Sequence, residues 1–370
     1  MLSPMKGATF CGTRREDDGM AWQIPLSTNV AIDLGEADSL LVLPNVAVAI
    51  TGFNTAVYGS GGSQSVEVYG SIGAWMSGVF LGDAPNQLAQ NSVYVGRTGH
   101  IQSFLDTGVA FWGQQSSLTN EGTITSKVYG ALFNGIGAGK SMLDNAGLIS
   151  GDTIGIWHTG SEALATTNSG RILSKDRAYV DAAGGQDILT NTGRIVGNIV
   201  FGDGNDTYNG QTGALKGKVY GDGGNDTLRG GADKDVFYGG AGDDKLYGGT
   251  GKDVLAGNAG VDKLYGGADA DTFVYSRLSD STRPAMDMIM DFARGDVINL
   301  SAIDANAAVA GNQKFAFIGS AAFHGIAGEL RFQTAGGDTF VYGDVNGDRI
   351  ADIAIRIDTP TAFVAADFIL

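Results

Sequence analysis

Aspartates at a fixed spacing are the strongest chemical signal in this chain. Nine-residue repeats run without a gap from Gly221 to Val274, and each has aspartate at its sixth position: Asp226, Asp235, Asp244, Asp253, Asp262 and Asp271. A carboxylate supplies the hard oxygen ligand that Ca²⁺ prefers. The pattern therefore predicts a row of calcium sites.

The other positions of the repeat indicate how the aspartates are brought together. The eighth residue is always large and apolar, as on a short strand with one face in a core. Glycines at the second and fourth positions permit turns with φ > 0 and bring backbone carbonyls close to an ion. Those expected to contribute are Gly224, Gly240, Gly242, Gly249 and Gly251. This spacing is typical of a parallel β-roll in which one coil takes two repeats.

That coil length predicts which aspartates face each other. Asp226 should face Asp244, and Asp235 should face Asp253, with the later pairs following in the same way. An earlier half-repeat at 201–209 matches the pattern through Asp206, which we expect to form a further site. Aspartate or asparagine replaces some of the turn glycines, and both tolerate the left-handed conformation better than most residues.

A second repeat with a longer period precedes the first. The phrase Asn-x-Gly-x-Ile recurs at 120–124, 145–149, 168–172 and 191–195, with degenerate copies at 97–101 and 211–215. Its glycines are 23, 25, 23, 23 and 20 residues apart. A period of this length is typical of one coil of a right-handed parallel β-helix. We expect its asparagines to stack in a ladder of side-chain amides, and its isoleucines to stack inward.

Composition sets the outer limits on fold and partners. The chain has 370 residues, 59 glycines and a formal charge of −16, with no basic stripe to bind nucleic acid or an anionic lipid surface. A single cysteine, Cys11, excludes an intrachain disulfide. No apolar run is long enough to form a transmembrane segment. We expect an all-β protein with four parts: a cap at 1–69, the β-helix at 70–215, the β-roll at 216–274 and a C-terminal domain at 275–370.

The nonapeptides and the segments after them resemble a known family. DTFVYSRLSDST (271–282), MDFARGDVINLSAIDAN (290–306) and GDVNGDRIADIAI (343–355) are similar to the C-terminal domain of serralysin-type secreted metalloproteases. With the repeats, this identifies residues 202–370 as an RTX (hemolysin-type calcium-binding repeat) protein. The resemblance implies bound Ca²⁺, a β-sandwich-like end and an extracellular location. It also implies export by a type I ABC machinery that reads an uncleaved C-terminal signal, which AADFIL (365–370) matches.

The resemblance does not extend to the protease's catalytic domain. A serralysin needs an HExxH motif and a third histidine to bind zinc. This chain has only His100, His158 and His324, without that motif. The sequence therefore excludes zinc protease activity.

Two classes of function are compatible with the N-terminal half, which resembles autotransporter and pectate-lyase-like parallel β-helices. One is a non-enzymatic matrix, adhesion or surface-associated protein whose partner is an extracellular polysaccharide or the cell surface. The alternative is a polysaccharide lyase or C5-epimerase acting on a uronate polymer, which is an analogy from the fold alone.

An enzyme of the second class needs a base and nearby cations. Aligning the coils on their glycines stacks Lys127, Asp152 and Lys175 in one column, and His158 over Asp181 in another. We interpret both columns as structural, with a salt-bridged outer face, and we assign no catalytic residue. The sequence favours the non-enzymatic class.

Overall fold

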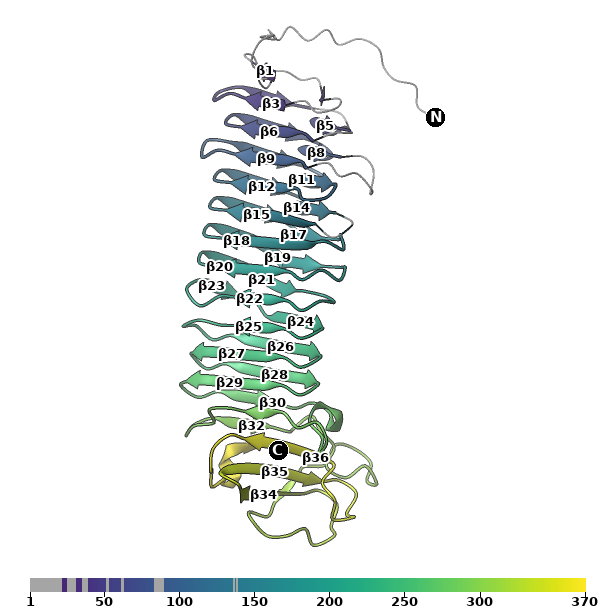
Figure 1. The fold of residues 1–370 in the computed structure, drawn as a ribbon, viewed down its shortest axis with the longest axis vertical. Helices are drawn as coiled ribbons and strands as arrows, with labels where there is room; N and C mark the ends of the chain where they lie inside the picture. Colours follow the sequence, from purple (N-terminus) through teal and green to yellow (C-terminus); the bar gives the residue numbers. More distant parts are fainter. Residues whose placement is uncertain are drawn as a thin grey trace. The chain divides into compact units, whose positions relative to one another are not determined.

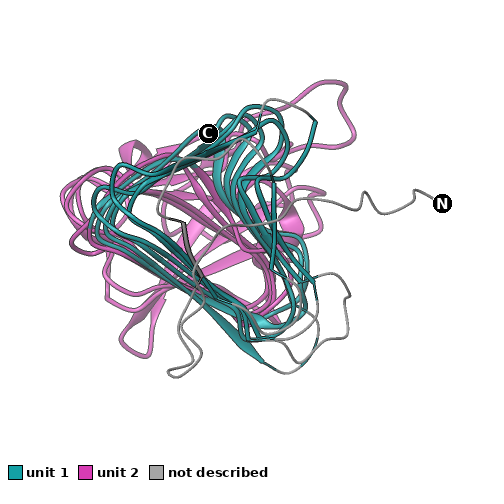
Figure 2. Ribbon diagram, turned by 90° about the horizontal axis from the view of Figure 1, so that it is seen from above, with its two compact units in different colours: residues 1–185, 193–197 teal, residues 186–192, 198–370 magenta. Residues whose placement is uncertain are grey.

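The computed structural model describes residues 22–24, 31–34, 39–50, 53–60, 63–82, 90–135, 137 and 139–370. Cys11 and much of the expected cap lie outside these ranges. The chain divides into two compact units, unit 1 at 1–185 and 193–197 and unit 2 at 186–192 and 198–370 (Figure 2). The described elements are strands, apart from the 3₁₀ turns η1 (Leu278–Asp280) and η2 (Ala365–Asp367) (Figure 1). Among them, no helix has the length and apolar character to cross a membrane.

Unit 1 is a parallel β-helix whose coils have three faces (Figure 2). The first face consists of β1 (Trp22–Ile24), β3 (Ser39–Val42), β6 (Ser65–Val68), β9 (Ser92–Val95), β12 (Ser117–Asn120), β15 (Lys140–Asn145) and β18 (Ala163–Asn168). The second consists of β4 (Ala47–Ala49), β7 (Ser71–Ala74), β10 (His100–Ser103), β13 (Thr123–Ser126), β16 (Leu148–Gly151) and the start of β19 (Arg171–Asp181). The third consists of β2 (Ile32–Asp33), β5 (Val57–Gly59), β8 (Val79–Leu81), β11 (Thr107–Trp112), β14 (Tyr129–Asn134), β17 (Ile154–His158) and the end of β19.

The Asn-x-Gly-x-Ile repeat sets the register of these coils, as the sequence predicts. Ile101 pairs with Ile124, Ile124 with Ile149 and Ile149 with Ile172, and all four side chains are buried. Asn145 lies at the centre of the amide ladder. Its Nδ2 donates to Oδ1 of Asn168, and its Oδ1 accepts from Nδ2 of Asn120, at 2.7 Å in both cases. The Asn145 amide is thus satisfied by its neighbours along the helix.

Parallel strand pairing is already present before residue 70, although the Asn-x-Gly-x-Ile repeat is recognisable only after this residue. Ser39 of β3 pairs with Ser65 of β6, and Ala47 of β4 pairs with Ser71 of β7. Alternating buried apolar residues such as Leu40 and Val42 maintain the register there without the glycine signature. The four domain boundaries expected from the sequence stay predictions.

Unit 2 contains the β-roll, built on two parallel sheets. One consists of β20 (Ile188–Asn191), β22 (Thr207–Asn209), β25 (Thr227–Arg229), β27 (Lys245–Thr250), β29 (Lys263–Ala268) and β31 (Met288–Ile289). The other consists of the end of β21 (Arg194–Val200), β24 (Val219–Gly223), β26 (Val236–Ala241), β28 (Val254–Ala259), β30 (Thr272–Val274) and β32 (Val297–Asn299). The short β23 (Ala214–Lys216) precedes β24 in the chain. Leu228 pairs with Leu246 and Phe237 with Leu255, so one coil takes two nonapeptides. The apolar eighth positions form a fully buried core, as expected.

The residues after the roll extend both of its sheets. An antiparallel meander of β34 (Glu329–Ala335), β35 (Asp338–Asp344) and β36 (Ile353–Ile357) joins the first sheet where β36 pairs with β31. The short β33 (Ala316–Phe317) pairs with β34, and the terminal β37 (Phe368–Ile369) joins the second sheet beside β32. The open end of the roll is thereby covered by paired strands, as a solenoid end requires. A sandwich-like arrangement of this end stays a prediction.

The amide ladder gives a test of unit 1. Asn145→Ala removes the hydrogen-bonding group between Asn120 and Asn168, and buried amides left without a partner cost about 1–3 kcal/mol. We expect the free energy of unfolding of unit 1 to fall by about that amount. Tryptophan fluorescence during urea unfolding measures it, because all four tryptophans lie in the residues of unit 1. Gln102→Ala, at an exposed position of β10, is the control. Equal unfolding midpoints for the two variants would contradict the ladder's role.

Candidate metal centre

The six nonapeptide aspartates are buried beside glycines that leave room for them. The first residue of every repeat is glycine, and a Cβ there would lie no more than 2.5 Å from Oδ2 of the aspartate five residues later. The six glycines are Gly221, Gly230, Gly239, Gly248, Gly257 and Gly266. No side chain larger than hydrogen fits at these positions without moving the carboxylate. The first glycine is thus required for close approach, a reason that the sequence analysis did not identify.

The turns adopt the left-handed conformation that the second and fourth positions suggest. Gly224, Gly240, Gly242, Gly249 and Gly251 have φ between +109° and +124°. The replacements Asp222, Asn258 and Asp269 also have positive φ, between +69° and +80°. Aspartate and asparagine therefore keep the turn geometry that glycine provides elsewhere.

The aspartates form two columns along the roll, each linked through the backbone. In the first column the N–H of Asp226 donates to Oδ1 of Asp244, and the N–H of Asp244 donates to Oδ1 of Asp262, both at 2.8 Å. The second column links Asp235, Asp253 and Asp271 in the same way, at 2.8 and 2.9 Å. These are the facing pairs that the coil length predicts.

Both columns continue beyond the nonapeptides. The N–H of Asp206 donates to Oδ1 of Asp226 at 2.7 Å, so the half-repeat extends the first column, and a further ion site at Asp206 stays a prediction. The N–H of Asp187 donates in turn to Asp206. At the other end, Asp262 donates to Oδ1 of Asp287 and Asp271 donates to Oδ1 of Asp296.

Sequence reasoning missed Asp187, Asp287 and Asp296 because they lie outside the regular nonapeptides. The step from Asp262 to Asp287 and the step from Asp271 to Asp296 are both 25 residues, against 18 within the roll. A weaker signal is present in the sequence. Asp287-Met-Ile289 and Asp296-Val-Ile298 keep the aspartate and the inward apolar residue of the repeat while losing its glycines.

One oxygen of most column members is buried without a hydrogen-bond donor. These are the Oδ2 atoms of Asp226, Asp244, Asp253, Asp262, Asp271 and Asp287. Asp235 differs, because its Oδ2 accepts the N–H of Gly231 at 2.9 Å. Its turn also has Asp233 in place of the fourth glycine, and Asp233 is not among the residues with positive φ. Asp235 is therefore the least suited of the six nonapeptide aspartates to bind an ion.

The carboxyl groups of the columns have strongly shifted acidity. Burial, the largest cause, raises the pKa of Asp226, Asp235, Asp253, Asp262 and Asp271 from 3.8 to about 6. It raises the pKa of Asp244 to about 8 and that of Asp287 to about 9, where neighbouring carboxylates add to the effect. Ionised carboxylates in this environment need a cation.

The donor set fits Ca²⁺. Each column offers unpartnered carboxylate oxygens, and glycine carbonyls lie beside them. The carbonyl oxygens of Gly239, Gly248 and Gly257 are close to the first glycines of the facing coil. An all-oxygen set of carboxylates and backbone carbonyls is the coordination that calcium takes. The aspartates and the turn glycines would hold the ions, and a bound ion would neutralise the buried charge.

A second acidic loop is saturated by its own backbone. Oδ1 of Asp344 accepts the N–H groups of Asn346 and Gly347, and its Oδ2 accepts that of Arg349. Oδ2 of Asp352 accepts from Val345. This is a hydrogen-bonded turn.

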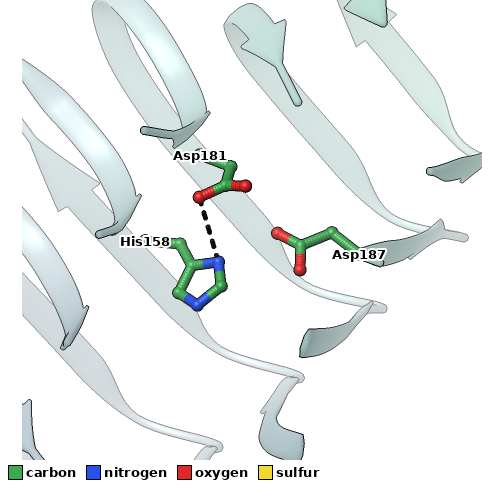
Figure 3. A group of neighbouring side chains, drawn as sticks. All are labelled: His158, Asp181 and Asp187. Atoms are coloured by element: carbon green, nitrogen blue, oxygen red, sulfur yellow. Dashed lines mark ion pairs between the residues drawn. The ribbon is translucent and has the colours of Figure 1, made fainter. Parts of the chain in front are cut away.

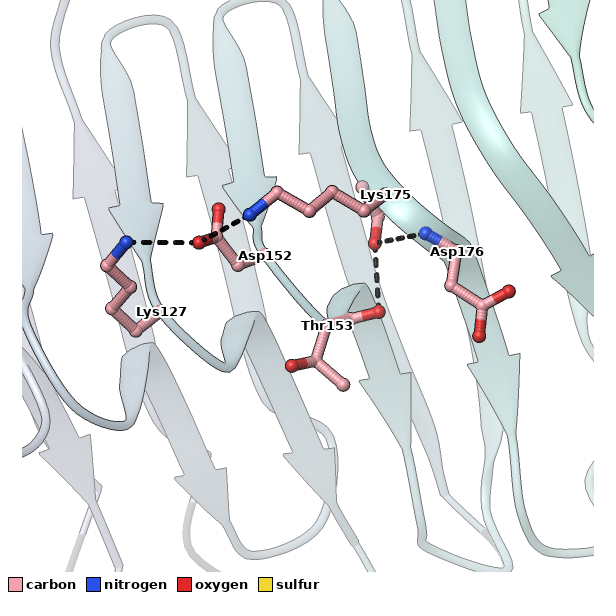
Figure 4. A network of polar contacts seen from close by, with 6 residues as sticks. Lys127, Asp152, Thr153, Lys175 and Asp176 are labelled. Carbon is pink, nitrogen blue, oxygen red and sulfur yellow. Dashed lines mark hydrogen bonds and ion pairs between the residues drawn. The ribbon is translucent and has the colours of Figure 1, made fainter.

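The two polar columns expected in unit 1 are both present. Oδ2 of Asp152 pairs with Nζ of Lys127 at 3.1 Å and with Nζ of Lys175 at 3.0 Å (Figure 4). These two bonds lower the pKa of Asp152 below its usual value. In the other column, His158 pairs with Asp181 through Nδ1 at 3.2 Å, and both side chains are fully buried (Figure 3). Asp187, also drawn in Figure 3, belongs to unit 2.

Comparison with known proteins connects the roll to one family. The family model described as the Peptidase M10 serralysin C terminal matches residues 167–370. No curated protein matches the chain. The solution structure of the AlgE6R3 subunit from the Azotobacter vinelandii mannuronan C5-epimerase is 27% identical over 39% of this chain and 77% of that one. The TM-score is 0.29, too low to establish a shared fold.

The raised pKa values of the column carboxyl groups predict how the metal-free protein responds to pH. A carboxyl whose pKa is higher in the folded state favours folding while it is protonated, and this contribution is lost as pH rises through the folded value. This contribution is complete below the ordinary pKa of 3.8, so in excess chelator we expect unit 2 to lose stability as pH rises from about 4 to about 9, through the folded pKa values of about 6 to about 9. Hydrogen exchange of the roll's amides measures this loss. Protection that rises with pH in chelator would show that the columns do not control stability.

A single carboxylate in the middle of a column tests the metal site directly. Asp244→Asn keeps the shape of the side chain and removes its charge, so we expect the calcium midpoint for folding of unit 2 to rise roughly tenfold. Asp243→Asn is the matched control, since it changes the same charge at the exposed neighbouring position. Isothermal titration calorimetry gives both midpoints. The site would be misassigned if the two variants bound calcium equally well.

Proposed function

The chain belongs to the Peptidase M10 serralysin C-terminal family, and we propose that it is a secreted protein whose unit 2 folds when Ca²⁺ fills the aspartate columns outside the cell. The observation that carries the proposal is the set of buried Oδ2 atoms without donors. A folded roll without cations leaves those carboxylates desolvated and close to one another, which is costly. Bound calcium removes that cost, so binding free energy becomes folding free energy.

The coupling suits passage from the cytosol to the exterior. Sites of extracellular modules have dissociation constants of about 10⁻⁴ to 10⁻³ M, so they fill only where calcium is abundant. Inside the cell the columns would stay empty and unit 2 unfolded. An unfolded chain is the form that a type I ABC exporter is proposed to carry.

The C-terminal residues also favour export of the chain before unit 2 folds. Phe368 and Ile369 form β37 beside β32, and Phe368 packs against Phe363 and Phe317 at ring-centroid distances of 5.2 and 5.1 Å. The ring of Phe368 is buried in the folded protein, so an exporter that reads this ring would bind it before unit 2 folds, and therefore before calcium binds.

For unit 1 we propose a non-enzymatic matrix, adhesion or surface role. The two clusters considered for catalysis have their groups engaged with each other. Asp152 binds two lysines, and the side chains of His158 and Asp181 are both fully buried. A base buried in this way is not accessible to a polymer, so neither cluster favours the lyase or epimerase alternative.

The test is a calcium titration of the full-length protein, starting in chelator. We expect far-ultraviolet circular dichroism to show a cooperative gain of β structure at about 10⁻⁴ to 10⁻³ M Ca²⁺. Tryptophan fluorescence, which reports on unit 1 alone, should change little. Magnesium is the control ion, because it dehydrates reluctantly and demands a stricter geometry. Identical spectra in chelator and in calcium would overturn the proposal.

The enzymatic alternative has its own readout. Incubation with a uronate polymer in calcium should produce neither unsaturated sugar ends, seen by ultraviolet absorbance, nor inverted C5 centres, seen by proton NMR of the polymer. Either product would replace the non-enzymatic assignment with the lyase or epimerase class.

A further inference from the structure

One corner of unit 1 carries a column of exposed aromatic side chains. Phe53, Trp75 and Phe104 lie in the turns before β5, β8 and β11, on three successive coils, and are 77%, 40% and 46% exposed. Their ring centroids are 5.8 and 6.1 Å apart in sequence order. We call these three residues the aromatic ladder. Exposed aromatic rings in a contiguous row mark an interaction site.

The rings are spaced by the coils that carry them. Parallel strands of neighbouring coils lie about 4.8 Å apart, which fixes the repeat of the ladder along the helix axis. The rings are tilted by 47° and 42° to one another, so they do not cover each other by flat stacking. A ligand with a flat apolar face at each repeat can contact successive rings. An extended polysaccharide has this form, because each sugar ring presents a C–H face and the rings repeat at a comparable distance.

Charged groups of both signs continue the same corner. The turn at Phe104–Asp106 is followed on the next coil by the turn at Lys127, and the N–H of Val128 donates to the carbonyl of Asp106 at 3.2 Å. Lys127, Asp152 and Lys175 then occupy three successive coils, with the lysine side chains 65% and 77% exposed (Figure 4). We call these three residues the charged column. It carries two positive charges and one negative charge in a chain of net charge −16.

The size of the patch argues against a protein partner. The ladder and its exposed neighbours Met76 and Leu105 make a strip of five side chains over three coils. A stable protein interface takes about 20–30 residues from each side. The second face beside the strip has polar outward residues such as His100 and Gln102, both exposed. A narrow aromatic strip with polar flanks fits a single polymer strand.

We propose that this corner of unit 1 binds a strand of acidic polysaccharide, with sugar rings stacked on the aromatic ladder and carboxylates facing the charged column. The proposal rests on the non-enzymatic role of unit 1 and names its partner class. The ring faces supply dispersion and C–H contacts, and the lysines supply the preference for an acidic sugar.

The experiment uses the full-length protein folded in calcium, with short alginate oligomers, which do not gel with calcium, as the acidic probe and soluble neutral β-glucan oligomers as the comparison. Calorimetry gives the affinities. We expect Phe104→Ala to weaken alginate binding about tenfold. Phe104→Tyr keeps the ring and should bind alginate as tightly as the parent protein. Met142→Ala is the matched control, since Met142 is a 60% exposed apolar residue on another face of unit 1. Lys127→Ala should weaken binding of alginate and leave binding of the β-glucan unchanged.

Several results would overturn the inference. One is that Phe104→Ala and Met142→Ala bind alginate equally well. Another is that the parent protein binds neither probe. A third is that it prefers the neutral β-glucan. A dimer seen by sedimentation and abolished by Phe104→Ala would show that the ladder joins copies of the chain. None of these results alters the calcium titration, and Phe104→Ala should titrate like the parent protein. Failure here is therefore distinguishable from failure of the calcium-coupled folding.

Discussion

Unit 2 depends on how a column of buried carboxylates is neutralised. Each aspartate lies one coil from the next and accepts the backbone N–H of its neighbour, yet most members keep an oxygen that no donor reaches. The backbone hydrogen bonds fix the position of the carboxylates without balancing their charge. Burial is the largest cause of the raised pKa values of the columns, and repulsion between neighbouring carboxylates adds to it. The glycines, the turns and the spacing of 18 residues serve to place oxygens where a cation can bind.

In unit 1 the polar side chains that stack from coil to coil are neutral amides instead of carboxylates. In its ladder each amide nitrogen donates to the amide oxygen on the next coil, and its inward stack is aliphatic. Where it buries a charge, as at Glu162, one carboxylate oxygen accepts the N–H of Gln115 at 3.0 Å and the other accepts the hydroxyl of Ser141. These contacts need no ion. The two units therefore share parallel coils but differ in what stabilises them, and calcium should act on unit 2 alone.

The sequence predicts the fold and the aspartate columns best where a strict period is kept. The nonapeptides give the coil length, the inward residues and the facing aspartates, because each of these depends only on spacing. The ends of the columns are not predictable in this way. Asp287 and Asp296 reach the columns after an insertion of turns, and the tertiary structure, not the spacing, brings them into line. The aromatic ladder is likewise hidden in the sequence, since Phe53, Trp75 and Phe104 occupy turns of different length.

Asp287 links the first aspartate column to the C-terminal meander of β34, β35 and β36. Its Oδ1 accepts the N–H of Asp262, and its backbone carbonyl accepts the N–H of Arg356 in β36 at 2.9 Å. The next residue, Met288, pairs with Arg356 in the same sheet. An ion that neutralises Asp287 therefore stabilises the strand on which the meander docks, and a docked meander holds Asp287 in its column. Under the proposed calcium binding, filling of the site at Asp287 and docking of the meander would therefore favour each other.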